Sequence, residues 1–284
     1  MASAIAPQTR PGPVHVTVSD LARSVDYYRE AVGLEVVEQG AGRASLGAGG
    51  GELLVLVEEE GAHSSRGYTG LYHFALLVPE RVQLAAWLAH AARDGVPLVG
   101  LSDHEVSEAL YLADPDGHGI EIYRDRPRET WEGHIGERLT TMPLDVEDLL
   151  GELDDPASAP FDGLPAGTVM GHVHLKVADI PATIAFYRDV LGFDLTAQLG
   201  SQAAFLSAGG YHHHVGANTW ESAGAPPPPP GTAALRHTAI LFPDAAARDE
   251  VVARVEDADG HIEEHDGAPL VRDPSGNALV LTVA

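Results

Sequence analysis

The sequence predicts an α+β protein built from four βαβββ modules, two in each half of the chain. The first observation is an internal repeat at an offset of 159, which relates residues 16–29 to residues 175–188. A second pair of segments, residues 72–80 and residues 236–244, also matches. The third observation is a shared local pattern, in which a short apolar strand ends at an acidic residue that can cap a helix. The chain is therefore a duplication of a unit that is itself double.

The elements of each module follow from local signals. The helices are expected to stop at Gly33, Gly95 and Gly192, because glycine is the common residue just past a helix end. The strands that follow are expected from short runs rich in apolar and β-branched residues. The clearest such runs are residues 53–57, 110–112, 120–123, 203–206 and 278–283. Asp-Pro-Asp-Gly at residues 114–117 and Asp-Pro-Ser-Gly at residues 273–276 predict tight turns between strands.

The repeat divides the chain into two predicted domains, residues 10–128 and residues 167–284, with two modules in each. Residues 129–166 between them are acidic and interrupted by proline and glycine, which predicts a linker carrying one short surface helix around residues 146–153. A run of prolines at residues 226–230 predicts a stiff surface loop, with a proline-rich recognition ligand as the alternative.

The composition restricts the classes of partner. The 284 residues suffice for two domains, and 42 acidic against 17 basic residues give a formal charge of −25. Such a surface repels phosphate backbones and anionic lipid, so neither nucleic acid nor a membrane is an expected partner. Cysteine is absent and no run of about 20 apolar residues occurs, so we expect a cytoplasmic protein. A homo-oligomer remains compatible with the sequence.

Residues 103–121 carry the densest group of chemically active side chains. His104 is followed by Tyr111, by the tight turn at residues 114–117, and by Glu121 on the strand that leaves the turn. Because the turn makes its two flanking strands neighbours, Tyr111 and Glu121 are expected to lie side by side. An imidazole, a phenol and a carboxylate would then share one pocket suited to acid–base chemistry.

This passage resembles the signature of extradiol ring-cleavage dioxygenases, and nearly the whole chain resembles the bacterial two-domain catechol 2,3-dioxygenases of the vicinal oxygen chelate superfamily (glyoxalase, bleomycin resistance and extradiol dioxygenase). The resemblance extends over residues 70–74, 125–131, 170–175 and 209–214. It implies that the four βαβββ modules form two glyoxalase-like open β-barrel cups. In this family a metal lies in such a cup, held by the first strand of each of two modules and by a last strand.

The resemblance also selects ligand positions. The family's first-strand ligand precedes the acidic helix start by seven residues, and this count selects His73, His172, His237 and, in the first module, Pro13. The last-strand ligand is Glu121, whose repeat partner is Val280. Proline and valine cannot bind a metal, so the first and fourth modules have each lost one ligand position.

Three pairings of modules would give different sites. Pairing module one with module two gives only two of the usual ligands, His73 and Glu121. His15 could supply a third, since it projects from the same strand face as the missing position. Pairing three with four gives two histidines, with His214 as a third. Pairing two with three unites His73, His172 and Glu121, the two-histidine, one-carboxylate triad typical of non-haem iron oxygenases. We favour this last arrangement, which also brings in His104 and Tyr111.

Further histidines are candidates for additional ligands or substrate contacts. In an extended segment His212 and His214 would face one way and His213 the other, so at most two could enter the pocket. His214 is a candidate for an extra ligand or substrate contact, and His174, close to His172, and His237 are further candidates. The structural alternative is that these rings are hydrogen-bonded core or surface residues.

The resemblance implies an iron(II) enzyme, with manganese(II) or another divalent metal as alternatives. Its expected substrates are a small aromatic diol, catechol or a substituted catechol, and dioxygen, and its product is a ring-opened semialdehyde. His104 would move a proton and Tyr111 would hydrogen-bond the substrate. The alternatives are a hydroquinone-type ring dioxygenase, a glyoxalase-like isomerase, and a non-catalytic protein that binds a small aromatic compound or drug.

Overall fold

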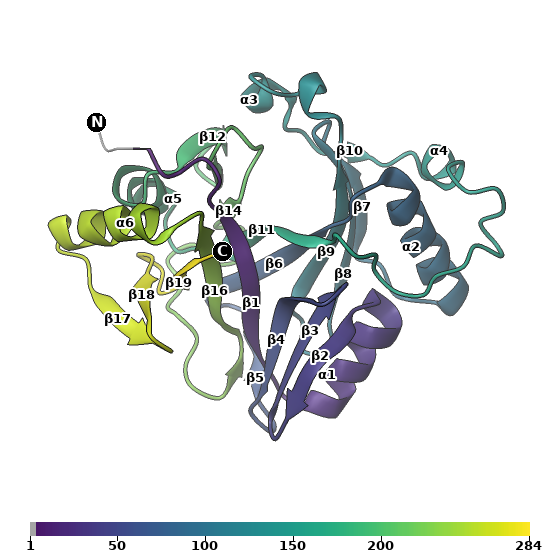
Figure 1. The fold of residues 1–284 in the computed structure, drawn as a ribbon, viewed down its shortest axis with the longest axis horizontal. Coiled ribbons are helices and arrows are strands. Elements are labelled where there is room, and N and C mark those ends of the chain that lie inside the picture. The colour runs from purple at the N-terminus through teal and green to yellow at the C-terminus, as the bar shows by residue number, and fades with distance from the viewer. Residues whose placement is uncertain (1–3) are drawn as a thin grey trace.

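The computed structural model describes residues 4–284, except for the side chains of residues 137 and 138. Two large curved sheets lie side by side, with the longer helices on their outer faces (Figure 1). The order strand, helix and three strands occurs in all four predicted modules, which confirms the predicted α+β fold.

One sheet combines the first and fourth modules. Its strands, in spatial order, are β17 Ile262–His265, β18 Ala268–Arg272, β19 Ala278–Val283, β16 Leu235–Phe242, β1 Arg10–Val18, β4 Gly51–Glu58, β3 Arg43–Ala48 and β2 Glu35–Gly40. The two modules join where β1 and β16 run antiparallel, with His15 opposite His237.

The other sheet combines the second and third modules. Its strands, in spatial order, are β10 Met142–Pro143, β7 Gly100–Asp103, β8 Ser107–Ala113, β9 Gly119–Asp125, β6 Gly70–Leu77, β11 Val169–Lys176, β14 Val215–Asn218, β13 Ala203–Ser207 and β12 Asp194–Leu199. Its modules join where β6 and β11 run antiparallel, with His73 opposite His174. Two short strands, β5 His63–Ser64 and β15 Thr232–Ala233, pair in parallel and join the two segments of the chain that run from one sheet to the other. The favoured pairing of modules two with three and one with four is therefore the one in the structure.

Except for α3, which begins after His134, each α-helix begins after an acidic residue. Their bounds are α1 Leu21–Tyr27, α2 Arg81–Asp94, α3 Ile135–Arg138, α4 Val146–Leu150, α5 Ile180–Ile184 and α6 Ala245–Asp257, with a 3₁₀ turn η2 Arg128–Thr130. The π-helical turns η1 Tyr28–Val32 and η3 Ala185–Val190 extend α1 and α5. The carboxylates of Asp20, Asp179 and Asp244 each accept a backbone N–H three residues on, which caps the helix start. Gly33 and Gly95 follow helix ends with positive φ, as expected.

Each predicted tight turn is a hub that ties neighbouring modules together. The Asp114 carboxylate accepts the backbone N–H groups of Asp116 and His118, and the buried Tyr28 hydroxyl donates to its other oxygen at 3.0 Å. Since Tyr28 belongs to the first module and Asp114 to the second, this contact joins the modules of one half. The sheets, in contrast, join modules from different halves.

The segment between the halves packs against helix α2 and against one edge of the second sheet. Its helix α4 packs against α2, and its strand β10 adds to the edge of β7. The predicted short helix is thus present, whereas the boundaries of the domains at residues 10–128 and 167–284 stay a prediction, because each sheet takes strands from both segments. Residues 226–230 form a surface loop without regular structure.

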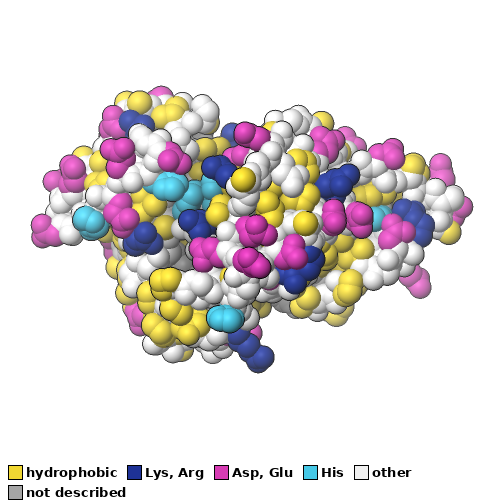
Figure 2. Space-filling model, turned by 90° about the horizontal axis from the view of Figure 1, so that it is seen from below, with side chains coloured by type: hydrophobic (Ala, Val, Ile, Leu, Met, Phe, Trp, Pro, Cys, Tyr) yellow, Lys and Arg dark blue, Asp and Glu magenta, His cyan; other side chains and the backbone are white. Residues whose placement is uncertain are grey.

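The surface agrees with the composition. Asp and Glu side chains spread over the face seen in Figure 2, with the fewer Lys and Arg side chains between them. Among residues 4–284, no helix has the length and apolar character needed to cross a membrane.

Candidate metal centre

Three buried side chains converge at the centre of the second sheet. The His73 Nε2 and His172 Nε2 atoms lie 3.0 Å and 3.1 Å from the same oxygen, Glu121 Oε2. The two Nε2 atoms lie 3.3 Å apart. All three residues are at most 7% exposed. Among the described residues, this is the group of three or more His, Cys, Asp or Glu side chains whose ligand atoms could hold one metal ion.

The strand register explains this convergence. Glu121 on β9 and His172 on β11 both pair with Ala75 on the central strand β6, so the three residues form one row across the sheet. His73 lies two residues from Ala75 and therefore projects from the same face. The small Ala75 side chain leaves room between its larger neighbours. Register shifts in the β6–β11 pair on both sides of His172 and His174 mark β-bulges, which commonly lie beside functional sites.

The electrostatics of this row fit a cation. Burial by itself would raise the pKa of Glu121, but the facing imidazoles of His172 and His73 outweigh it and hold that pKa well below its usual range. Burial lowers the pKa of His172, which favours its neutral form, although Glu121 opposes this shift. An ionised Glu121 carboxylate beside the neutral imidazole of His172 is a buried negative charge, which costs several kcal/mol unless a cation balances it.

The distances between the three ligand atoms also fit a metal ion. Two imidazole nitrogens 3.3 Å apart cannot both present a lone pair, or both a hydrogen, to each other without repulsion. Ligands about 2.1–2.3 Å from one ion and at right angles to each other would be roughly 3.0–3.3 Å apart, as these three atoms are. His73, Glu121 and His172 would therefore hold a divalent metal as a triad that leaves other positions open.

His104 and Tyr111 lie next to this triad. His104 Nε2 is 2.8 Å from the Tyr111 hydroxyl, and Tyr111 on β8 is opposite Glu121 on β9, as the turn predicts. His104 Nδ1 is 2.6 Å from the Thr140 carbonyl, which can only accept, so Nδ1 carries a hydrogen. In the neutral ring Nε2 therefore accepts from Tyr111. Burial, followed by the charge of Glu121, raises the pKa of Tyr111 well above its ordinary value.

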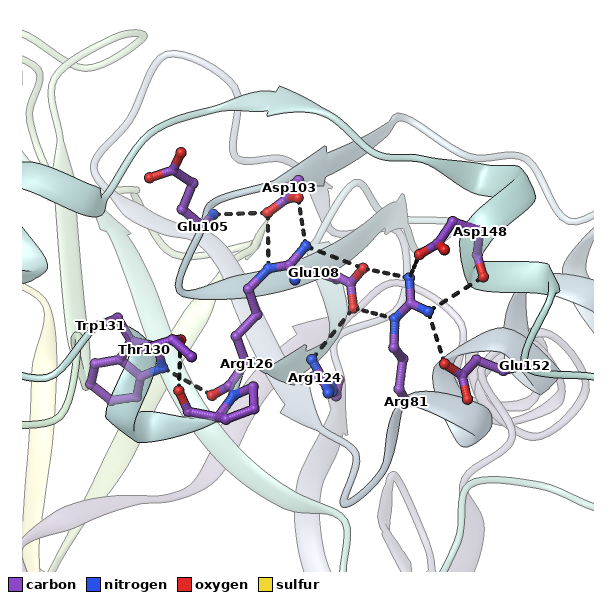
Figure 3. Close-up of polar contacts among 11 residues, drawn as sticks. Arg81, Asp103, Glu105, Glu108, Arg124, Arg126, Thr130, Trp131, Asp148 and Glu152 are labelled. Atoms are coloured by element: carbon purple, nitrogen blue, oxygen red, sulfur yellow. Dashed lines mark hydrogen bonds and ion pairs between the residues drawn. The ribbon is translucent and has the colours of Figure 1, made fainter.

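A network of ion pairs fixes the loop that carries His104 (Figure 3). The Asp103 carboxylate accepts the backbone N–H of Glu105 at 2.8 Å and the Arg126 guanidinium at 2.7 Å. These bonds hold Glu105 in its left-handed conformation, with φ of 60°. Next to them the buried Glu108 carboxylate accepts two bonds from Arg81, which ties β8 to the start of α2. The loop is therefore anchored on the side away from the metal triad.

A cavity of about 660 Å³ opens over these residues. The triad, His104, Tyr111 and His174 line it, so the structure brings six of the eight predicted site residues together. His174 stands beside His73, with ring centroids 5.0 Å apart, and its buried Nε2 has no hydrogen-bond partner within residues 4–284. Its position beside the triad is the expected one.

The two remaining candidates lie elsewhere. His237 lies in the other sheet and stacks on His15, with their ring centroids 3.9 Å apart. His214 is tied down outside the cavity lining: its Nδ1 accepts the backbone N–H of Ala208 at 3.1 Å, and its ring stacks on Tyr211. The expected alternation failed because residues 211–214 are not extended, and β14 starts only at Val215.

The histidine that enters the cavity is His213, which the sequence reasoning missed. Its ring centroid is 4.1 Å from that of His172, and its Nδ1 is 2.8 Å from His212 Nδ1. His212 Nε2 in turn is 2.9 Å from the Asp125 carboxylate. Two consecutive glycines with positive φ precede this segment, at residues 209 and 210. That pair indicates a loop and was the available signal that strand alternation does not apply.

Comparison with known proteins agrees with this geometry. The model of the Glyoxalase/Bleomycin resistance protein/Dioxygenase superfamily matches residues 10–122 and again residues 169–281. The chain belongs to this superfamily. The expected resemblance is thus confirmed, and the two matches cover both halves of the internal duplication.

Members of the superfamily with high similarity include a catechol-2,3-dioxygenase. The catechol-2,3-dioxygenase of Bacillus subtilis (strain 168) is 40% identical over 283 residues, which is 97% of each chain. Among solved structures, a putative dioxygenase from Bacillus subtilis subsp. subtilis str. 168 matches with a TM-score of 0.65 and 16% identity, over 99% of this chain and 86% of that one. Glyoxalase I from Zea mays matches with a TM-score of 0.59 and 17% identity, over 96% and 92%. These two structures support the shared fold.

Proposed function

We propose that the protein is a non-haem iron(II) extradiol dioxygenase, which cleaves catechol or a substituted catechol beside its two hydroxyls to give a ring-opened semialdehyde. The single observation that carries the proposal is the buried His73, Glu121 and His172 triad in a chain that is 40% identical to a catechol-2,3-dioxygenase. A divalent ion at such a triad would lower the pKa of a bound diol and bring the diol and dioxygen into contact.

The protein's own residues then have distinct tasks. The cavity holds the aromatic ring against the row of ligands. The Tyr111 hydroxyl, whose pKa burial and Glu121 raise, stays protonated and can donate a hydrogen bond to a substrate oxygen. His104 can take up at Nε2 the proton that the bound diol releases, while its Nδ1–H stays on Thr140, and the protonated Nε2 then donates to the Tyr111 oxygen. His213 faces the same cavity beside His172 and is a second group that can hydrogen-bond the substrate.

The ligand set favours a dioxygenase over an isomerase of the glyoxalase kind. An isomerase of that kind needs four protein ligands. The metal-ligand group within residues 4–284 offers three, and His214 lies outside it. A non-catalytic binding protein would have no use for a buried carboxylate with two imidazoles turned toward it.

The test is oxygen consumption. Protein loaded with iron(II) under anaerobic conditions and then mixed with catechol and air should consume oxygen and produce a yellow ring-opened product. His104→Phe should lower the rate by roughly 10²-fold or more, because general acid–base groups contribute about 10²–10⁴. Thr141→Val is the matched control, since the Thr141 hydroxyl is 3.4 Å from His104 Nδ1 and the stronger bond to Thr140 remains. No oxygen uptake with any catechol by metal-loaded protein would refute the proposal.

A further inference from the structure

The cavity over the triad is larger than a single aromatic ring requires. Its volume of about 660 Å³ lies within the range of roughly 300–1,000 Å³ that is typical of sites for drug-sized ligands. Two of its lining residues, Gly100 and Ala113, have little or no side chain and therefore leave space in the cavity. A substituent on the catechol ring therefore has room.

The mouth of the cavity is apolar. Val99, Leu199 and Trp220 line it, and they are 74%, 49% and 47% exposed. These three are among the few large hydrophobic side chains that the described surface exposes to this extent. Val99 precedes β7, Leu199 ends β12 and Trp220 follows β14, so the apolar rim comes from both modules. Apolar side chains exposed around one opening commonly mark a binding surface.

An aromatic wall connects this rim with the metal triad. The ring centroid of Trp220 is 5.4 Å from that of Tyr72 and 5.7 Å from that of His174. His174 in turn is 5.0 Å from His73. A flat apolar group that extends from a diol at the triad would meet aromatic faces along this path, a contact that contributes beyond the buried area alone.

The charged residues of the cavity lining do not favour an anionic group. Lys176 is the chain's only lysine and lines the cavity, but it is 6% exposed, and its Nζ is 3.4 Å from the Ser65 carbonyl. The carboxylate of Glu221, which lines the same cavity, interacts with this ammonium and offsets its charge. The formal charge of −25 also repels anions at long range.

We propose that the substrate is a catechol with a bulky apolar substituent, which rests on Trp220 while Val99 and Leu199 close over it. This inference rests on the proposed dioxygenase function and names its substrate class. Trp220 would then determine specificity through the affinity for the substituent.

The experiment compares catechol, 3-phenylcatechol, 4-phenylcatechol and the anionic 3,4-dihydroxyphenylacetate. The iron-loaded enzyme should have a kcat/KM roughly tenfold or more higher for one phenylcatechol than for catechol, the scale on which apolar pockets discriminate. Trp220→Ala should bring this ratio close to one, mainly by raising KM for the phenylcatechol. Calorimetric titration of Trp220→Ala with the phenylcatechol, in the absence of oxygen, should show the same loss of affinity as an increase in Kd. Leu199→Gln, at an exposed site, tests the rim where Trp220→Ala fails to fold.

Val37→Ala is the matched control, because Val37 is a 46% exposed hydrophobic residue outside the cavity lining, in the other sheet. It should leave the substrate ratio unchanged. Turnover of catechol with no preference for either phenylcatechol, or a preference for 3,4-dihydroxyphenylacetate, overturns the inference and leaves the dioxygenase function standing. Absence of turnover with all four compounds refutes the dioxygenase function itself.

Discussion

The two large sheets are built from equivalent modules, but their central rows carry different chemistry. The sheet of modules two and three has a row of metal-ligand side chains. The equivalent residues at the centres of the two sheets are His73 and His237, His172 and Pro13, and Glu121 and Val280. In the sheet of modules one and four, His237 is the one metal-ligand residue among His237, Pro13 and Val280, and the described residues of that sheet form no metal-ligand group.

The surroundings of the two rows correspond strand by strand. His15 opposes His237 as His174 opposes His73. Leu270 opposes Val280 at the place where Tyr111 opposes Glu121. The first sheet therefore keeps the histidine pair, while its carboxylate and phenol positions hold aliphatic residues that pack as core.

What both halves retain is the turn. Asp273 accepts the backbone N–H groups of Ser275 and Asn277 and the Tyr187 hydroxyl, in the manner of Asp114 with its own neighbours and Tyr28. The tight turn thus belongs to the architecture, whereas the candidate metal-ligand group found within residues 4–284 lies in one sheet. The comparison predicts that equivalent substitutions in the two sheets differ in kind, with loss of metal in one and loss of packing in the other.

The largest expected effect is at the carboxylate position. Glu121→Gln should remove the metal and lower the dioxygenase rate on the order of 10³-fold, because the ion supplies several kcal/mol of charge stabilisation. Its counterpart Val280→Ala should retain metal and activity and cost about 1–3 kcal/mol of stability through a small cavity. Metal content by mass spectrometry and urea unfolding measure the two outcomes. Full metal content in Glu121→Gln contradicts the assignment.

An effect of intermediate size is expected on the folding stability at acidic pH. Burial first, then the neighbouring His265 and Arg236, lower the pKa of His237 to about 4, and burial and His237 lower that of His15 to about 3. Because both rings bind protons more readily in the unfolded chain, their contribution to stability is full above pH ~6.5 and is lost as the pH falls toward 4.

His237→Phe keeps a ring at this position without a titratable nitrogen. We expect it to reduce the fall in unfolding free energy between pH 6.5 and 4 by on the order of 1–2 kcal/mol, after allowance for solvent screening. Urea unfolding across this pH range, with the variant and the native chain both treated with chelator, is the measurement. Equal slopes for the two proteins would show that the stacked pair of His15 and His237 does not couple to folding.

The last comparison is between the two turn hubs. Tyr28→Phe removes a 3.0 Å hydrogen bond to Asp114 and should cost about 1.5–3 kcal/mol, as bonds to charged groups do. Tyr187→Phe removes a 3.4 Å bond to Asp273 and should cost less than about 1 kcal/mol. Both tyrosines are fully buried, so packing losses are similar. A larger loss from Tyr187→Phe would show that the turn of the second half is the more important one.

Much of the fold was predictable from the sequence because the duplication repeats strong local signals. Acidic helix caps, glycine stops and the two Asp-Pro-x-Gly turns each act over a few residues, and all appear in the structure. The pairing of modules was predictable by a different argument, because only modules two and three together supply His73, Glu121 and His172.

The features that the sequence did not predict depend on contacts between distant segments. The entry of His213 into the cavity depends on a loop in which His214 donates its backbone N–H to Leu206 and His212 is held by Asp125, far away in the sequence. The anchoring of the His104 loop by Arg126 and Asp103 also spans strands. Local periodicity carries no information on either contact.

The most direct measurement is anomalous diffraction at the iron edge from crystals of protein loaded anaerobically with iron(II). We expect one strong peak per chain, between the side chains of His73, Glu121 and His172. A peak beside His15 and His237 in the other sheet, or no peak between the three ligands in protein that contains iron, would contradict the proposed metal site.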